Sequence, residues 1–219
     1  MMPALNEEDS IAETIGRIPL DELKTKGYES DILIVDGGST DKTVEISRKC
    51  GAGIIKTRRG YGWQYRIGFE AAEGEIIVTA DSDCSYPMES IPEFLEMLEK
   101  EKLEFITTNR FAFMKKGSMA LPNKIGNKVL TLFANFLFNL NLKDSQSGMW
   151  IIRKEALKKI KLESLGMPLS QEIKIEAFAK LKAMEVGSTY NKRVGKVKLR
   201  MFQNGWDNLK HLFKKKFLG

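Results

Sequence analysis

The stretch EIIVTADSD, residues 75–83, decides the fold, because an apolar run ends there in two carboxylates, Asp81 and Asp83. Its Ile and Val residues, bounded by turn-forming residues, predict a short strand that is buried on both faces. Further strands are predicted by the same pattern at residues 31–36, 53–57 and 104–108. Strands of this kind place the residues that follow them at one edge of a sheet, where ligands bind in α/β proteins.

Amphipathic stretches with helical spacing lie between these strands. Asn6 is the expected N-cap of the first helix, and Ser39 or Thr40 is the expected N-cap of the next, which ends near Gly51. Further helices are predicted at residues 62–72, 89–99 and 171–182. Alternating strands and helices predict an α/β fold with parallel βαβ units, in which helices cover both faces of a doubly wound, mostly parallel sheet.

Composition narrows the class of protein. With 219 residues, 42% of them hydrophobic and 29% charged, the chain suits one globular domain. Two cysteines exclude a disulfide scaffold, and one histidine argues against a histidine-based metal centre or a Ser-His-Asp triad. The net charge is +6, and the excess of Lys and Arg lies after residue 191. This distribution predicts that the C-terminal part of the chain binds an anionic partner. We expect a cytoplasmic protein, since no apolar run reaches the roughly 18–20 residues that span a bilayer.

The two strand-end loops contain the residue types that bind a metal and a phosphate. Asp81 and Asp83 can converge on one Mg²⁺ or Mn²⁺ ion, which carboxylates and substrate phosphates hold together. The alternative is a simple turn that caps the strand. The loop Asp36-Gly37-Gly38-Ser39 allows close approach of an anion to a helix N-terminus, although an ordinary strand-to-helix turn would use the same residues.

Five segments in order carry a resemblance to a known family: PALNEEDSI, ILIVDGGSTD, AEGEIIVTADSD, NRF and DSQSGMWIIRKEAL. They resemble the family 2 glycosyltransferases, and within these the polyprenyl-phosphate glycosyltransferases typified by dolichol-phosphate mannosyltransferase. The likeness runs from residue 3 to about residue 199. It implies a GT-A fold, a nucleoside-diphosphate sugar donor, a divalent metal and inversion at the sugar.

The resemblance also implies roles for single residues. The residues implied to bind the nucleotide sugar are Pro3, Glu7, Val35, Asp36, Gly37, Asp81 and Ser82. The implied metal ligands are Asp81, Asp83 and Ser85, and Asp83 is the principal one. Asp83 is also assigned a catalytic role, together with Arg110 and Lys124, which would meet phosphate. Acceptor contacts fall on Asp144, Ser147, Gly148, Glu172, Lys192, Arg193 and Lys198.

The sequence departs from the family pattern at four places, one of which is Val197, where a serine is common. Many relatives have two Asp residues where this chain has Asp36-Gly37, which leaves UDP and GDP open as the nucleotide. Ser85 replaces a glutamine of the mannosyltransferase type. Relatives also have a full apolar strand before the Pro3 motif, where only Met1 and Met2 stand here. We therefore expect the true start to lie upstream and the chain as given to be poorly stable.

The chemistry of the acceptor separates two functions. A lipid phosphate is already an anionic nucleophile and needs no base, only cations that bring it to the donor. Arg110, Lys124 and the basic residues Lys192, Arg193 and Lys198 suit that purpose. A hydroxyl acceptor would need a base instead, for which Glu172 or Asp144 are the candidates.

Two segments have the character of membrane-surface helices. Residues 125–142 are very apolar but too polar and short to span a bilayer, and they predict either an interfacial helix or a buried core helix. Residues 201–219 place Trp206, Leu209, Phe213 and Phe217 on one helical stripe beside several lysines. Such a basic amphipathic helix predicts a membrane-surface anchor, with docking on the domain or on a partner as the alternatives.

The sequence therefore predicts a glycosyltransferase domain over residues 1–200 and a basic helix over residues 201–219. The expected activity is transfer of a hexose from UDP- or GDP-hexose to dolichyl or other polyprenyl phosphate, with peripheral attachment at the cytoplasmic membrane face. The alternative within the family is a glycan or glycolipid hydroxyl as acceptor. A sugar-phosphate nucleotidyltransferase would need a Gly-rich basic loop on its first strand, and a nucleic-acid binder would leave Asp81 and Asp83 unexplained.

Overall fold

The computed structural model describes residues 1–195 and 201–218. Its strands are β1 (Met2–Ala4), β2 (Leu33–Asp36), β3 (Gly53–Lys56), β4 (Ile76–Thr79), β5 (Phe105–Met114), β6 (Trp150–Arg153) and β7 (Ala183–Tyr190). Its α-helices are α1 (Ile11–Gly16), α2 (Leu20–Thr25), α3 (Thr43–Lys49), α4 (Tyr61–Ala71), α5 (Ile91–Lys100), α6 (Leu121–Phe138), α7 (Leu169–Lys180) and α8 (Met201–Leu218). Short 3₁₀ helices cover η1 (Met88–Ser90) and η2 (Lys154–Lys159).

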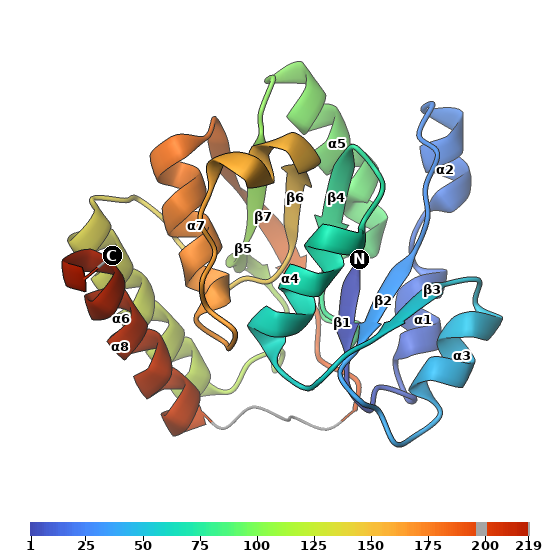
Figure 1. The fold of residues 1–219 in the computed structure, drawn as a ribbon, viewed down its shortest axis with the longest axis horizontal. Helices are drawn as coiled ribbons and strands as arrows, with labels where there is room; N and C mark the ends of the chain where they lie inside the picture. The colour runs from blue at the N-terminus through green and yellow to red at the C-terminus, as the bar shows by residue number, and fades with distance from the viewer. Residues whose placement is uncertain (196–200, 219) are drawn as a thin grey trace.

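The strands form two sheets that lie next to each other (Figure 1). In the first sheet β1, β2 and β3 are parallel, and in the second the order is β4-β6-β5-β7. Strand β6 runs antiparallel to both of its neighbours, whereas β7 is parallel to β5. Across the seam between β1 and β4, the amino group of Met1 donates a hydrogen bond to the carbonyl of Val78 at 2.8 Å.

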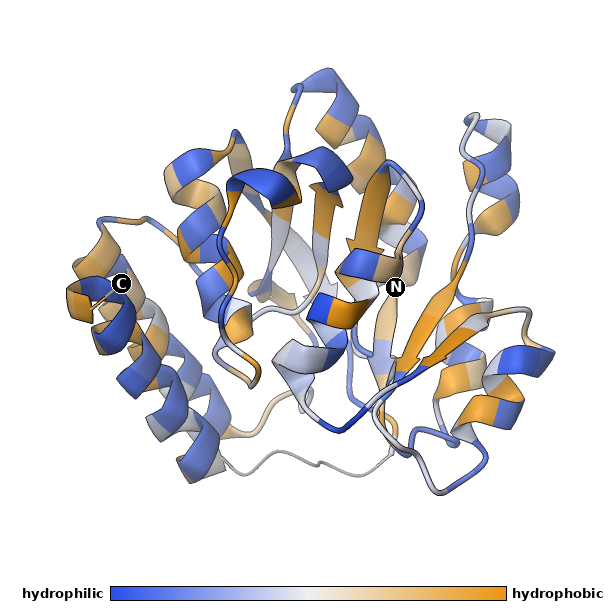
Figure 2. Ribbon diagram, viewed as in Figure 1, coloured by the Kyte–Doolittle hydropathy of each residue, from blue (hydrophilic) through white to orange (hydrophobic). Residues whose placement is uncertain are grey.

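Helices cover both faces of the sheets and enclose two apolar clusters. On one face α1 and α5 pack with Ile34, Ile106 and Ile151, and on the other α4 and α7 pack with Trp150 and Ile152. Neighbouring residues of β6 thus point into opposite clusters, as alternation along a strand requires. Figure 2 shows β2, β3 and β4 as hydrophobic and the helices as two-faced. The two clusters confirm the predicted α/β fold with helices on both sides of the sheets.

The first helix differs from the prediction. It starts at Ile11 and not at Asn6, whose backbone φ of 53° is left-handed. The Asn6 side-chain oxygen instead accepts a hydrogen bond from the Thr40 amide at 2.8 Å, and the Ser39 hydroxyl accepts one from the Asn6 amide at 2.9 Å. These residues therefore join the loops after β1 and β2 at the sheet edge and do not cap helices.

Helices α6 and α8 lie side by side at one end of the molecule and run in the same direction (Figure 1). The rings of Phe133 and Phe213 are 6.3 Å apart, and Leu137 and Leu212 belong to one buried cluster with Ile175 of α7. The structure thus places both amphipathic segments against the domain, each with one face turned outward. Within residues 1–195 and 201–218, no helix has the length and apolarity that crossing a bilayer requires.

Candidate active site

The turn after β4 forms the centre of the site. Cys84 adopts a left-handed φ of 64°, which bends the chain so that Ser85 lies beside Asp83. The amide and hydroxyl of Ser85 donate hydrogen bonds to Oδ1 of Asp83 at 3.0 and 2.5 Å. The predicted third metal ligand thus orients Asp83 in this structure. The Ser82 hydroxyl donates to the Pro3 carbonyl at 2.7 Å, which joins the turn to the end of β1.

Two further predicted residues meet at this turn. Nη1 of Arg193 lies 2.9 Å from Oδ2 of Asp83, and Nη2 lies 2.5 Å from Oε1 of Glu7. Glu7 and Asp83 are both buried, so the guanidinium balances two carboxylates that would otherwise repel each other. From the sequence, Arg193 is assigned to the acceptor, whereas the structure pairs it with Asp83, the expected metal ligand.

Asp81 lies on the other side of the turn. Burial and the neighbouring Asp83 carboxylate raise the pKa of Asp81 to about 7. A side chain at Gly148 would place its Cβ 2.7 Å from the Tyr61 hydroxyl and 3.4 Å from Oδ1 of Asp81. Gly148 is therefore a residue that lets the acceptor-side loop approach the aspartate turn closely.

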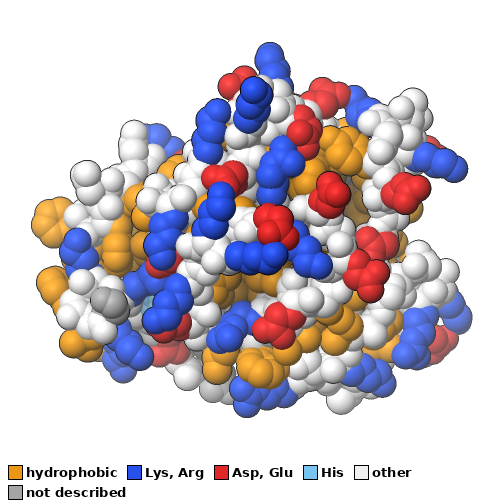
Figure 3. Space-filling view, turned by 45° about the horizontal axis from the view of Figure 1, so that its top comes forward, with side chains coloured by type: hydrophobic (Ala, Val, Ile, Leu, Met, Phe, Trp, Pro, Cys, Tyr) orange, Lys and Arg blue, Asp and Glu red, His pale blue; other side chains and the backbone are white. Residues whose placement is uncertain are grey.

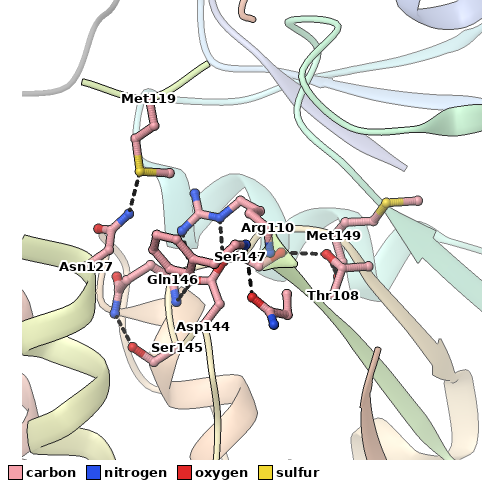
Figure 4. A network of polar contacts seen from close by, with 12 residues as sticks. Thr108, Arg110, Met119, Asn127, Asp144, Ser145, Gln146, Ser147 and Met149 are labelled. Atoms are coloured by element: carbon pink, nitrogen blue, oxygen red, sulfur yellow. Dashed lines mark hydrogen bonds and ion pairs between the residues drawn. The ribbon is translucent and has the colours of Figure 1, made fainter. Parts of the chain in front are cut away.

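The acceptor-side loop is held by an ion pair between two predicted site residues. Arg110 donates from Nε to Oδ2 of Asp144 at 2.7 Å and from Nη2 to Oδ1 at 2.9 Å, and the Arg110 amide also donates to Oδ2 (Figure 4). Both side chains are buried. Ser147 shares a 2.7 Å hydrogen bond with Thr108, and the Gly148 amide donates to the Tyr86 hydroxyl at 2.6 Å. The loop is consequently rigid in structure and anchored to β5.

The loop after β2 is held by its own aspartate. Asp36 is buried, and its carboxylate accepts hydrogen bonds from the amides of Gly38 and Ser39 at 3.1–3.2 Å. The side chain of Gln64 bridges the carbonyls of Ala4 and Val35 at 3.0 and 2.8 Å. A Cβ at Gly37 would approach this side chain to 2.9 Å. Gln64 therefore fills the space beside residue 37, so a side chain there would require Gln64 to move.

Four predicted residues lie outside this arrangement. Lys124 is in the first turn of α6, and Lys192 is exposed; neither side chain makes an ion pair with Asp81 or Asp83 in the described part of the chain. Glu172 is fully buried on α7, where it accepts hydrogen bonds from the amides of Glu163 and Ser164 and faces Lys215 of α8. Lys198 lies outside the described residues.

The donor set of the turn fits a hard divalent cation. Asp81 and Asp83 supply carboxylate oxygens, and the Arg193 guanidinium shows that a positive charge is already favoured between Glu7 and Asp83. No group of three or more His, Cys, Asp or Glu side chains suited to a metal occurs among the residues that the structure describes. Two carboxylates on one turn suit Mg²⁺ or Mn²⁺, which proteins hold through one or two carboxylates together with substrate phosphates.

Reasoning from the sequence missed several residues of the site. Tyr65 and Tyr86 bring their hydroxyls to the acceptor-side loop, and Gln64 joins the ends of β1 and β2. Their sequence signal is weak, because buried tyrosine and glutamine on or next to helices look like packing residues. Only the close approach of Gly148 and Gly37 shows which side chains face the site.

Comparison with known proteins identifies the family. The family model described as Glycosyl transferase family 2 matches residues 1–161. The low-salt glycan biosynthesis hexosyltransferase Agl6 of Haloferax volcanii is 33% identical over 97% of this chain and 52% of its own length. A dolichyl-phosphate hexose transferase of the same organism is 33% identical over 94% and 87%, respectively. The dolichol-phosphate mannosyltransferase of Pyrococcus furiosus is 25% identical over 98% and 62%.

Solved structures agree on the fold. Glucosyl-3-phosphoglycerate synthase from Mycobacterium tuberculosis, crystallised with Mn²⁺, UDP and phosphoglyceric acid, has a TM-score of 0.78 at 20% identity. That match covers 98% of this chain and 76% of the synthase. The GT-A fold, the ordered motifs and the family model lead to one conclusion. This chain belongs to glycosyl transferase family 2.

Proposed function

We propose that this protein is an inverting glycosyltransferase that moves a hexose from a nucleoside-diphosphate sugar to a polyprenyl phosphate of the dolichyl type. The observation that carries the proposal is the contact between the aspartate turn and the acceptor-side loop, where Gly148 lies against Asp81. Two relatives whose names specify dolichyl or dolichol phosphate support the lipid acceptor. The chain spans 52% of the Agl6 sequence, and the hexosyltransferase name of that relative supports the sugar.

The donor would bind at the edge formed by the loops after β1, β2 and β4. Asp81 and Asp83 would hold the divalent metal, which when bound neutralises the diphosphate and makes it a better leaving group. The Asp36 turn gives a fixed backbone for the nucleotide, because its carboxylate already binds the two amides that follow. UDP and GDP are both compatible with this loop.

The environment of the two candidate bases favours a phosphate acceptor over a hydroxyl acceptor. Burial alone would raise the pKa of Asp144, but the charge and hydrogen bonds of Arg110 outweigh it and hold that pKa below its usual value. Glu172 is buried beneath α8, and its pKa is also lowered, because His211 and main-chain amides outweigh the effect of burial. A carboxylate with a lowered pKa is a weak base, whereas a phosphate nucleophile needs none.

The acceptor would reach the site from a membrane surface. On α6 and α8 an exposed stripe is formed by Leu121, Ile125, Val129, Leu132, Phe136, Phe202, Trp206, Phe213, Phe217 and Leu218. Lysines accompany it, and Figure 3 shows hydrophobic side chains beside Lys and Arg at the left edge of the molecule. Apolar side chains flanked by lysines suit the headgroup region of an anionic bilayer. We place the protein peripherally at the cytoplasmic membrane face.

Transfer of radiolabelled hexose into organic-extractable lipid tests the proposal. The assay supplies UDP- or GDP-hexoses, polyprenyl phosphate and Mn²⁺ or Mg²⁺. We expect label in the lipid phase from one donor, and a loss of at least about 100-fold in the Asp83→Asn variant, since the charge that holds the metal is gone. The matched control is Asp9→Asn, which removes a charge from an exposed residue near the same edge.

The possible results separate the acceptors. Donor hydrolysis without labelled lipid would favour a glycan or glycolipid hydroxyl as the acceptor. Absence of donor binding in the folded protein would contradict the transferase. Equal activity of Asp83→Asn and Asp9→Asn would contradict the role of the aspartate turn.

A further inference from the structure

The segment after β7 crosses directly over the aspartate turn. The Asn191 amide donates to the Ser85 carbonyl at 2.8 Å, and the Val194 amide donates to the Asp83 carbonyl at 3.0 Å. These two bonds hold Arg193 above the turn. Its side chain is 22% exposed, so the guanidinium lies mostly out of solvent between Glu7 and Asp83.

Both carboxylate oxygens of Asp83 are engaged. Oδ1 accepts from the amide and hydroxyl of Ser85, and Oδ2 lies 2.9 Å from Nη1 of Arg193. Ser85 is fixed within the same turn, whereas Arg193 is brought in from a distant part of the sequence. A metal ion at Oδ2 would bring a second positive charge against the guanidinium, so the two cations compete for Asp83.

One N–H group of the guanidinium also lacks a hydrogen-bond partner in this position. Its Nε is buried and has no hydrogen-bond partner within the described residues. A buried donor without a partner carries a cost that a move toward another anion would remove. The diphosphate of a nucleotide is such an anion, and guanidinium groups pair well with phosphate oxygens.

We propose that Arg193 is the resident counter-cation of the aspartate turn and competes with the divalent metal for Asp83. The inference rests on the proposed function, because it assumes a metal–diphosphate complex as ligand. The metal alone has to displace Arg193 without giving it a new partner. A nucleoside diphosphate supplies that partner, so metal and nucleotide bind cooperatively and metal alone binds weakly.

Titration of Mn²⁺ by electron paramagnetic resonance, without sugar or lipid, tests this competition. The full chain is compared with Arg193→Met, Arg193→Lys and the matched control Lys192→Met, which removes the same charge from the exposed neighbouring residue. We expect Arg193→Met to bind Mn²⁺ about tenfold more tightly than the unaltered protein, as the loss of a charged hydrogen bond implies. Arg193→Lys and Lys192→Met should stay within about threefold of it.

Repeating the titration with UDP and with GDP gives the second readout. In the unaltered protein the nucleotide that binds should tighten Mn²⁺ binding, and in Arg193→Met this enhancement should be several-fold smaller. Unchanged or weaker Mn²⁺ binding by folded Arg193→Met would overturn the proposal. So would Mn²⁺ binding that survives in the double variant Asp83→Asn/Arg193→Met, because the ion would then sit elsewhere. A protein that shows the competition but transfers no sugar would disprove only the proposed function.

Discussion

Lys174 shows how single buried charges shape the acceptor side of the molecule. It is fully buried on α7 and donates a hydrogen bond from Nζ to the Asp144 carbonyl at 2.8 Å. Burial lowers the pKa of Lys174 to about 7, with Arg110 adding to the decrease and the carboxylates of Asp144 and Glu185 opposing it. A lysine that supports the acceptor-side loop thus changes its charge near neutral pH.

This pKa predicts a dependence of stability on pH. The folded protein binds the Lys174 proton only below about pH 7, whereas the unfolded chain binds it up to about pH 10.5. Unfolding therefore takes up a proton between these values, and the contribution of Lys174 to the free energy of unfolding rises with pH, by at most about 1.4 kcal/mol per pH unit. Urea denaturation at pH 7, 8 and 9 should show this rise relative to Lys174→Met.

The control for this prediction is Lys158→Met, which removes a lysine whose side chain is 72% exposed. Its free energy of unfolding should run parallel to that of the unaltered protein over the same pH range. A parallel course for Lys174→Met as well would show that the buried ammonium does not titrate in this window.

The charged residues of the site could be identified from the sequence alone, but their ion-pair partners could not. Asp81, Asp83 and Asp36 follow apolar strands, so their place at the sheet edge could be predicted. The pairing of Arg110 with Asp144, and of Arg193 with Asp83, could not, because the partners are 34 and 110 residues apart in sequence. Nothing in the local pattern says which basic residue a fold brings to which carboxylate.

Helix α7 shows that the position of a helix can be predicted from the sequence when the partners of its side chains cannot. The prediction for residues 171–182 agrees with α7, but Glu172 was assigned to the acceptor and is buried against α8. Gln146 donates to the Gln171 side chain, and Gln171 donates to the Asn208 carbonyl of α8 at 2.7 Å. Buried polar residues on both sides of α7 thus connect the acceptor-side loop with α8, which a hydrophobic pattern does not reveal.

Three strands were not predicted: the short β1, where the sequence indicated that a full strand was missing, and strands β6 and β7. Strand β6 has only four residues, WIIR, and β7 mixes polar and apolar residues in AMEVGSTY. A run as short as β6 carries little periodicity, and β7 lies at the edge of its sheet, where polar side chains are tolerated. No local sequence signal encodes the antiparallel direction of β6.

The exposed stripe of α6 and α8 predicts binding to lipid vesicles. Phe136 is 82% exposed on α6 and Phe217 is 68% exposed on α8. Replacing both with Ser removes apolar surface from each helix without touching the core, so sedimentation with vesicles of phosphatidylcholine and anionic phosphatidylglycerol should fall by about tenfold or more.

Leu20→Ser is the matched control for vesicle binding, because Leu20 is 42% exposed on α2 and does not belong to the stripe. Its sedimentation should equal that of the unaltered protein. If the double variant also sediments fully, the stripe does not face the bilayer, and a change in its oligomeric state on gel filtration would point to a protein partner.

The whole molecule divides at the seam between β1 and β4. Strand β1 has three residues, and the hydrogen bonds across the seam include those of the Met1 amino group and the Ser82 hydroxyl, while one apolar cluster packs against both sheets. The sheet of β1–β3 ends at β3, both of whose terminal residues are exposed, whereas β6 is sandwiched between β4 and β5. Protection should therefore differ between the two halves.

Native-state hydrogen exchange followed by mass spectrometry measures this difference. Amides of β6 should exchange at least about 100-fold more slowly than amides of β3, because an edge strand opens locally and a central one opens only with the core. Peptides that cover residues 53–56 and 150–153 provide the comparison. Equal rates in the two peptides would mean that both sheets open as one unit.

Helix α8 packs against the rest of the folded protein. Leu212 and Asn208 are buried, and Lys215 contacts the carboxylates of Glu176 and Glu172 at 2.7 and 3.4 Å. These contacts of α8 with the rest of the protein resemble those between two subunits that are joined in one chain. A shortened form that ends at residue 195 would expose two carboxylates and the apolar side chains of Ala134, Leu137 and Ile175, and a separately synthesised α8 peptide should rebind there.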